Sequence, residues 1–335
     1  MASFGLNLGV SAREPIRRIV DVARAAEGHG FETMWVLDSQ FAMKDVYVAL
    51  ALAAEATRRI QLGTGVTNPV TRHVTHTANA IAAVDEVSEG RALLGIGSGD
   101  SSVFPLGVRP ASIAEMRRAL EDLRALLAGR EIDAGGHPVR VATVRRPVPI
   151  FVGGSQPRLL TLAGELADGV ILLGAADAEL TAWQIEWIER GARRAGRRLA
   201  DVFVDLWLPI SFNEDEGKAR EDLKAIGASQ ARWFHRWKER PPVLERFRDE
   251  FARAAQAYEF AEHLSLHAPH RASVSDEFTD FVALAGGVEK CVSRIRGLLD
   301  LKVDRISFTL LSGGRLDRIT QLGERLLPRL APVVG

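Results

Sequence analysis

The chain has 335 residues, 47% of them hydrophobic, which is enough for one large core or for two domains of ordinary size. Its 43 basic and 43 acidic residues balance, which argues against a protein that binds nucleic acid or anionic membranes. The single cysteine, Cys291, excludes an internal disulfide and is typical of a reducing compartment. The first residues do not resemble a secretory signal, and no apolar run reaches the roughly 18 residues of a membrane helix. We therefore expect a cytoplasmic protein.

Short apolar runs alternate with longer amphipathic runs along the chain. The apolar runs predict strands at 4–10, 33–38, 60–66, 91–97, 148–154, 169–175, 201–210 and 304–311. The runs with helical spacing predict helices at 15–29, 46–57, 74–87, 112–127, 157–166, 178–195, from about 214 onwards, and at 316–330. Each predicted strand is followed by a predicted helix.

Eight strand–helix units indicate an α/β fold. Most of the strands are continuous apolar runs, as expected of parallel strands that are covered on both faces. The pattern predicts a single (β/α)8 TIM barrel over residues 1–335, with a doubly wound open sheet as the alternative. Three stretches interrupt this pattern. Residues 98–111 suggest a loop after the fourth strand, residues 130–147 suggest a small hairpin, and residues 225–290 suggest a mostly helical insertion before the last strand.

The functional site of such a barrel lies at the C-terminal ends of its strands. The residues at these ends are Asn7, Gly9, Asp38, Ser39, 65–68, 97–100, 153–156, Gly174, Ala175, Pro209, Ser211 and 311–313. Asp38 and Asp100 are the acids in this ring of strand ends. Glycines after the third, fourth and fifth strands leave the backbone open to a flat ring and a phosphate.

Each of these motifs has a second interpretation. GIGSGD at 95–100 is a weak dinucleotide fingerprint, because its last glycine is missing and it follows the fourth strand. GGSQP at 153–157 opens a helix, so it predicts either a phosphate site or a tight turn. Asp38 and Asp100 are also plausible as helix caps or loop acids.

The later part of the chain carries histidines and a basic aromatic stretch. His263 and His267 have the spacing of two zinc ligands, but no Cys or acid follows at a matching spacing, so we expect no metal. RWFHRWKER at 232–240 favours a helix that packs on the barrel rim. Contact with a substrate or an anionic tail is its alternative interpretation.

Five segments together resemble a known family. They are FGLNLG, GFETMWVLD, VYVALALAAEATRRIQLGTGVTNPVTRH, ANAIAAVDEVSEGRALLGIGSGD and PIFVGGSQPRLLTLAGELADGVIL. The chain resembles the luciferase-like (bacterial luciferase superfamily) flavin and deazaflavin oxidoreductases. Within them it is most similar to the coenzyme F420-dependent subgroup that includes methylenetetrahydromethanopterin reductase. The resemblance covers nearly the whole chain and is clearest over residues 4–175.

The resemblance implies that a tricyclic ring binds at the barrel mouth. It implies a non-prolyl cis peptide bond at Gly65–Val66, in a bulge that presses on the ring, with Asn68 fixing the exit of the chain. Asp38 is expected to contact the ring, and Asp100 is expected to act as the acid beside the ring nitrogen. The other residues implied to bind the cofactor are Ser98, Gly99, Gly153, Gly154, Ser155 and Gln156.

Two residues depart from the family pattern. Asn7 stands where the most similar reductases have a glutamate that is expected to contact the pterin, and Asn cannot ionise. Ser39 stands where other members have a histidine that is used on alcohol or sugar substrates. We assign both positions to substrate binding, although neither substrate type carries over directly.

The main hypothesis is an F420-dependent oxidoreductase that transfers a hydride between the deazaflavin C5 and a small organic substrate. A methylene-tetrahydropterin or folate-like compound is the first candidate substrate. The alternatives are an FMN-dependent monooxygenase and a non-catalytic flavin-binding relative. By resemblance we also expect a homodimer.

Overall fold

The architecture is a closed barrel of parallel strands in a computed structural model that describes residues 3–259, 262, 268–310 and 314–330. Within these residues eight strands form the barrel: β1 (Ser3–Leu8), β2 (Thr33–Val36), β3 (Gln61–Thr64), β4 (Ala92–Ile96), β7 (Ile150–Gly154), β8 (Gly169–Leu173), β9 (Phe203–Phe212) and β11 (Arg305–Thr309). The barrel closes because β9 pairs with both β8 and β11, and β11 also pairs with β1. The predicted (β/α)8 barrel is therefore confirmed.

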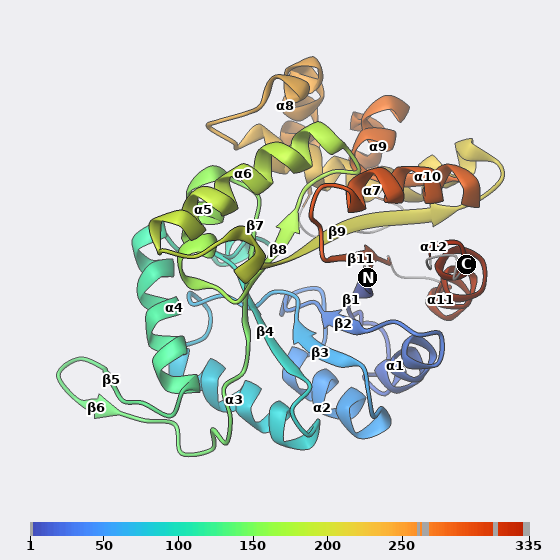
Figure 1. Cartoon of the computed structure of the whole chain (residues 1–335). Coiled ribbons are helices and arrows are strands. Elements are labelled where there is room, and N and C mark those ends of the chain that lie inside the picture. The colour runs from blue at the N-terminus through green and yellow to red at the C-terminus, as the bar shows by residue number, and fades with distance from the viewer. Residues whose placement is uncertain (1–2, 260–261, 263–267, 311–313, 331–335) are drawn as a thin grey trace.

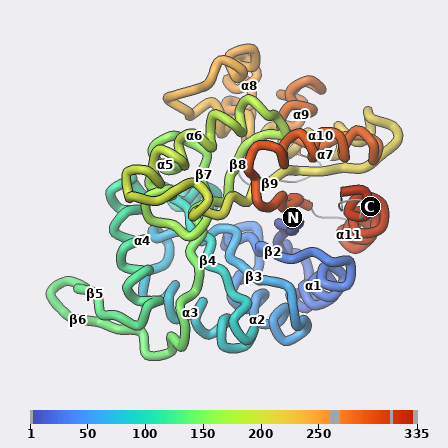
Figure 2. The backbone as a smooth tube through the Cα atoms, viewed as in Figure 1, coloured from blue at the N-terminus to red at the C-terminus, as the bar shows by residue number. Residues whose placement is uncertain are grey.

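Helices surround the strands on the outside (Figure 1). They are α1 (Arg18–Gly28), α2 (Val46–Ala56), α3 (Val74–Val87), α4 (Ile113–Leu127), α5 (Pro157–Leu166), α6 (Ala178–Arg194), α7 (Glu216–His235), α10 (Val288–Leu299), α11 (Arg315–Gln321) and α12 (Leu327–Leu330). A hairpin of β5 (Ile132–Asp133) and β6 (Pro138–Val139) lies within the predicted stretch and projects beyond α3 and α4 (Figure 2). Among the described residues, no helix is long and apolar enough to span a bilayer.

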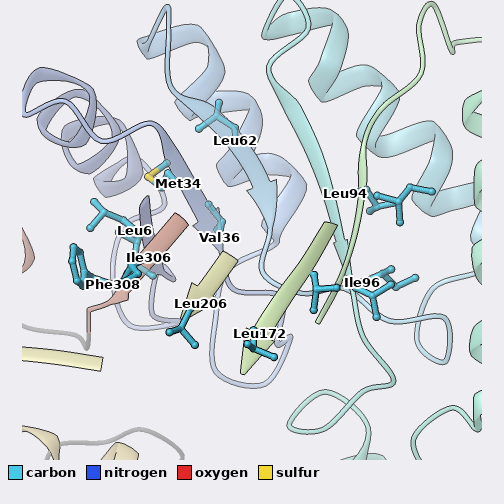
Figure 3. Close-up of a cluster of buried hydrophobic side chains, with 14 of the residues drawn as sticks. Leu6, Met34, Val36, Leu62, Leu94, Ile96, Leu172, Leu206, Ile306 and Phe308 are labelled. Atoms are coloured by element: carbon cyan, nitrogen blue, oxygen red, sulfur yellow. The ribbon is translucent and has the colours of Figure 1, made fainter. Parts of the chain in front are cut away.

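Alternate residues of each strand face opposite sides of the barrel wall. The residues that face the helices are aliphatic or phenylalanine, such as Leu6, Leu62, Leu94, Leu206 and Phe308, and they form the main core (Figure 3). The residues that face the barrel axis form a separate cluster of Trp35, Leu93, Phe151, Ile171 and Trp207. The continuous apolar runs in the sequence therefore come from two different cores on the two faces of one sheet.

The barrel interior also holds one buried ion pair. Arg305 Nη1 lies 3.4 Å from Asp205 Oδ2, and Trp35 Nε1 donates a hydrogen bond of 2.8 Å to the same oxygen. Arg305 also donates to Ser3 Oγ and Gln61 Oε1. These contacts tie β11 to β9, β1 and β3. Burial raises the pKa of Asp205, and the charge of Arg305 acts in the opposite direction.

The chain between α7 and β11 builds a second core beside the barrel. It contains α8 (Arg248–Ala257), α9 (Asp276–Val282) and the short strand β10 (Leu284–Gly286), which pairs with the end of β9. Phe234 of α7 packs edge-on against Phe278 of α9 and contacts Phe251 of α8. α8 and α9 thus hold the C-terminal half of α7 against the barrel (Figure 1). The sequence pattern did not single out β10, because three residues are too few to show a period.

Candidate active site

A cavity of about 890 Å³ opens at the C-terminal ends of the strands. Its size falls within the range of sites for small molecules and cofactors. The loops after β2, β3, β4 and β7 form one part of its wall, and one face of α7 forms another. The predicted residues that line it are Asn7, Asp38, Ser39, Gly65, Val66, Ser98, Gly99, Asp100, Gly153, Gly154, Ser155 and Gln156. The structure therefore brings together residues that lie more than a hundred positions apart in the chain.

Among the residues that were assigned to the cofactor or the substrate, Asn68 alone does not line the cavity. It is buried directly behind the wall, where its Nδ2 donates to Ser102 Oγ at 3.0 Å. Its Oδ1 accepts hydrogen bonds from the backbone N–H groups of Val70 and Thr71. Asn68 thus shapes the loop after β3 and links it to the loop after β4.

The glycines around the cavity are required mainly by neighbouring side chains. A Cβ at Gly65 would lie 2.9 Å from Trp207 Cη2 and 3.1 Å from Trp35 Cβ, so Gly65 packs onto the aromatic cluster. A Cβ at Gly97 or Gly153 would lie 2.9 Å or 3.0 Å from the Val66 side chain. The peptide bond between Gly65 and Val66 is cis. The absence of a Cβ at Gly65 therefore makes room for Trp207. This packing is a second reason for glycine at this position, beside the predicted approach of a ring.

The cavity floor presents unpaired polar atoms. Asn7 Nδ2 donates to Thr309 Oγ1 at 3.3 Å, but Asn7 Oδ1 has no partner although it is buried. Trp207 Nε1 is also buried without a partner, and both residues line the cavity. Buried polar atoms are normally hydrogen-bonded, so these two atoms are suited to meet polar groups of a ligand.

Asp38 follows β2 and faces the cavity with a largely buried side chain. Its Oδ2 is buried and lies 3.5 Å from Arg72 Nε. Burial raises the pKa of Asp38, and the nearby charge of Arg72 acts in the opposite direction. A carboxyl group in this setting can hold a proton closer to neutral pH than an exposed one can.

Asp100 lies in a different environment at the mouth of the cavity. Its Oδ2 accepts a hydrogen bond of 2.8 Å from Arg232 Nη2, and its Oδ1 accepts one of 3.4 Å from Arg236 Nη1. Arg232 lies in the last turn of α7 and Arg236 is the residue that follows this helix, and Arg236 also stacks over the ring of Phe104. Asp100 therefore joins the loop after β4 to the helix across the cavity.

Two helix N-termini reach the cavity, and they differ in their capping. Ser112 begins α4 with a capping box, in which its side chain accepts from Glu115 N. Gln156 precedes α5 without a side-chain cap, and Arg158 in the first turn of α5 also lines the cavity. The positive N-terminal end of the α5 dipole and the charge of Arg158 favour an anion at this end.

Sequence reasoning missed several lining residues. Met43, Arg158 and Trp207 were not proposed, and Arg232, Trp233 and Arg236 were assigned to packing on the rim. The sequence did contain a pattern that could have identified this part of the wall. Residues with helical spacing lie on one face of α7 and of the residue that follows it, and they are Ile226, Ser229, Trp233 and Arg236. His263, His267 and residues 311–313 lie outside the described residues.

The chain is similar to known proteins over nearly its whole length. A family model described as luciferase-like monooxygenase matches residues 1–305. A 5,10-methylenetetrahydromethanopterin reductase of Methanolobus tindarius is 33% identical over 313 residues, which cover 91% of this chain and 93% of that protein. An F420-dependent glucose-6-phosphate dehydrogenase of Nakamurella multipartita is 28% identical, with 95% and 93% covered. The structure of coenzyme F420-dependent tetrahydromethanopterin reductase from Methanopyrus kandleri matches with a TM-score of 0.80 and 27% identity, covering 98% of this chain and 99% of that one.

Proposed function

The chain belongs to the luciferase-like monooxygenase family, and on this premise we propose that it is an F420-dependent oxidoreductase acting on a small organic substrate. The observation that carries this proposal is the 33% identity to a methylenetetrahydromethanopterin reductase over nearly the full length of both chains. Two carboxyl groups in a cavity of cofactor size support it.

The cavity residues fit a deazaflavin with an anionic tail. When bound, the cofactor supplies hydride transfer at its C5. The backbone at Gly65–Val66, Ser98 and Gly99 would line the ring, and Asn7 and Trp207 leave polar atoms for a bound ligand. The N-terminus of α5, with residues 153–156 and Arg158, would hold the phosphate.

The proton chemistry falls to Asp38 and Asp100. Their environments differ, which is how neighbouring carboxyl groups take separate roles. Asp38 is buried with a raised pKa and is suited to hold a proton, whereas both oxygens of Asp100 accept hydrogen bonds from arginines. These hydrogen bonds hold the Asp100 side chain in one orientation at the mouth of the cavity.

A methylene-tetrahydropterin or folate-like compound is the substrate that we propose first. The similarity to reductases of this substrate class supports it. Asn7 and Ser39 lie in the cavity wall beside Asp38, where they would contact the substrate. Asn7 can only hydrogen-bond to such a substrate, so proton transfer at this position is excluded.

Fluorescence titration with F420 and with FMN tests the proposal. F420 fluorescence should change on binding while FMN fluorescence stays the same. One member of a substrate panel should then turn over: a methylene compound would oxidise reduced F420, whereas an alcohol would reduce oxidised F420. Preferential binding of FMN together with O₂ consumption would favour the monooxygenase of the family description instead. Binding of F420 without turnover of any substrate would favour a non-catalytic relative.

We also propose that the protein is a cytoplasmic homodimer. Its family membership and its single cysteine support this assembly and location. Light scattering on the purified protein should give twice the mass of one chain, and the mass of a single chain would contradict the dimer.

A further inference from the structure

A chain of charged groups runs from the cavity wall to the surface beside α2. Arg72 Nε lies 3.5 Å from Asp38 Oδ2, and Arg72 Nη2 lies 3.0 Å from Asp45 Oδ2. The side chains become more exposed in this order, from 6% for Asp38 to 30% for Arg72 and 44% for Asp45. The guanidinium group of Arg72 therefore bridges a carboxylate in the cavity and one near solvent.

Arg72 is held in this place from three sides. The turn organised by Asn68 Oδ1 delivers the backbone that precedes it. Asp45 uses its Oδ1 to cap α2, where it accepts from the N–H groups of Tyr47 and Val48, so its Oδ2 remains for Arg72. The Arg72 guanidinium also lies over the Tyr47 ring, 5.1 Å from its centroid.

The cavity end of this chain is buried among hydroxyl groups. Asp38 Oδ2, Tyr47 OH and Thr67 Oγ1 are all buried, and the Thr67 side chain acts on both Asp38 and Tyr47. The titratable and charged groups that act on Asp38 are Arg72 from the loop after β3, and Asp45 and Tyr47 from the start of α2. Burial raises the pKa of Tyr47 to about 12, so Tyr47 stays neutral. Arg72 is therefore the cation that acts on Asp38.

We propose that Arg72 is a positioning residue, which bridges Asp38 to Asp45 and thereby sets the charge that Asp38 presents to a ligand in the cavity. Arg72 does not relay protons, because a guanidinium group remains charged at all relevant pH values. Its effect is electrostatic: it favours the carboxylate form of Asp38 against the cost of burial. One part of this proposal rests on the proposed function, namely that the ligand beside Asp38 is the cofactor ring.

A double-mutant cycle on the ligand-free protein tests the pairing without any activity assay. The variants are Arg72→Gln, Asp38→Asn and the double variant, with melting temperatures measured from pH 5 to pH 8. Because burial raises the folded-state pKa of Asp38, folding favours its protonated form, and its destabilising effect appears as the pH rises through that pKa. Arg72→Gln should therefore lower the melting temperature more at pH 8 than at pH 5.

The cycle compares the cost of Arg72→Gln with and without the Asp38 carboxyl group, and the difference measures the interaction between the two side chains. At pH 8, Arg72→Gln should cost about 2–4 °C more in the presence of Asp38 than in the Asp38→Asn background. Equal costs in the two backgrounds would overturn the proposal. Arg109→Gln is the matched control, because Arg109 pairs with the exposed Glu115 and should show no coupling to Asp38.

A second measurement follows cofactor binding against pH. The F420 dissociation constant of the wild type should change as Asp38 ionises, and in Arg72→Gln this transition should move up by about one pH unit. Asp45→Asn keeps the cap of α2 but removes a like charge that raises the pKa of Asp38, so it should move the transition down, opposite to Arg72→Gln. If Arg72→Gln does not fold, Asp45→Asn alone tests the proposal. An unmoved transition in both variants would overturn the proposal, whereas failure of the wild type to bind F420 would count only against the proposed function.

Discussion

At the scale of single residues, the properties of the site depend on the side chains that surround each of its residues. Gly65 has no free space for a Cβ, because Trp207 and Trp35 fill it. Asp38 and Asp100 are both carboxyl groups of the cavity wall, yet Asp38 is largely buried beside one arginine and Asp100 meets two. Residue type alone therefore does not assign a role, and the neighbours of each residue do.

The substitution Gly65→Ala tests the close packing under the cavity. The new Cβ would push Trp207 toward the cavity, so we expect a loss of about 1–3 kcal/mol in unfolding free energy and weaker F420 binding. Thermal melting and fluorescence titration measure the two effects. Gly297→Ala in α10 is the control, because nothing lies within 4 Å of its Cβ and alanine favours a helix. An unchanged affinity for F420 in Gly65→Ala would argue against a ring at this bulge.

The substitution Asp100→Asn tests the carboxylate at the mouth. Acid–base groups contribute about 10²–10⁴-fold to turnover, so kcat should fall by at least about 100-fold. The dissociation constant of F420 should change by less than about threefold, because the amide keeps the shape of the side chain. Steady-state kinetics and a binding titration on the same preparation measure both numbers. Weaker binding with unchanged kcat would remove Asp100 from the chemistry.

At the scale of elements, the ends of helices decide what the cavity can hold. α4 satisfies its N-terminus with its own capping box, whereas α5 has no side-chain cap and carries Arg158 in its first turn. α7 contributes a face rather than an end, and its arginines reach the loop after β4. The end of α5 is therefore the part of the cavity wall that favours an anion, and α7 covers the mouth of the cavity.

The substitution Arg158→Ala tests phosphate recognition at α5. Removal of one exposed cation should weaken F420 binding about five- to tenfold at low salt, with a smaller effect at high salt. Affinity for a deazaflavin without the phosphate should not change. Titrations with both ligands at two salt concentrations measure this difference, and Arg118→Ala on the outside of α4 is the control. Equal losses for both ligands would place the phosphate elsewhere.

At the scale of the whole molecule, closure of the barrel brings charged groups into its interior. Arg305 comes from the last strand, and it reaches Asp205 on β9 and side chains on β1 and β3. A buried ion pair adds little net stability over an apolar pair, but breaking it leaves an uncompensated charge. The pair therefore makes the stability of the barrel dependent on correct pairing of β11.

The substitution Arg305→Leu tests this dependence. Asp205 would remain buried without its cation, so we expect a loss of about 3–5 kcal/mol in unfolding free energy. Because burial already raises the folded-state pKa of Asp205, the loss should be greater at pH 8 than at pH 5, where protonation removes the charge. Denaturant unfolding at both pH values measures it. Asp205→Asn in the same background should restore part of the stability, and no such rescue would contradict an electrostatic origin.

The sequence by itself determined the barrel and the position of the site. Both follow from local patterns: apolar runs predict strands, and Asp38, Asp100 and the glycines stand directly after those runs. The tertiary structure decided which residues meet across the cavity. Arg232 contacts Asp100, which lies 132 positions earlier in the chain. Arg72 pairs with Asp38 and Asp45, and neither helical nor strand periodicity predicts these pairs. Contacts between different strand–helix units depend on barrel closure and burial, and neither is encoded in the spacing within one unit.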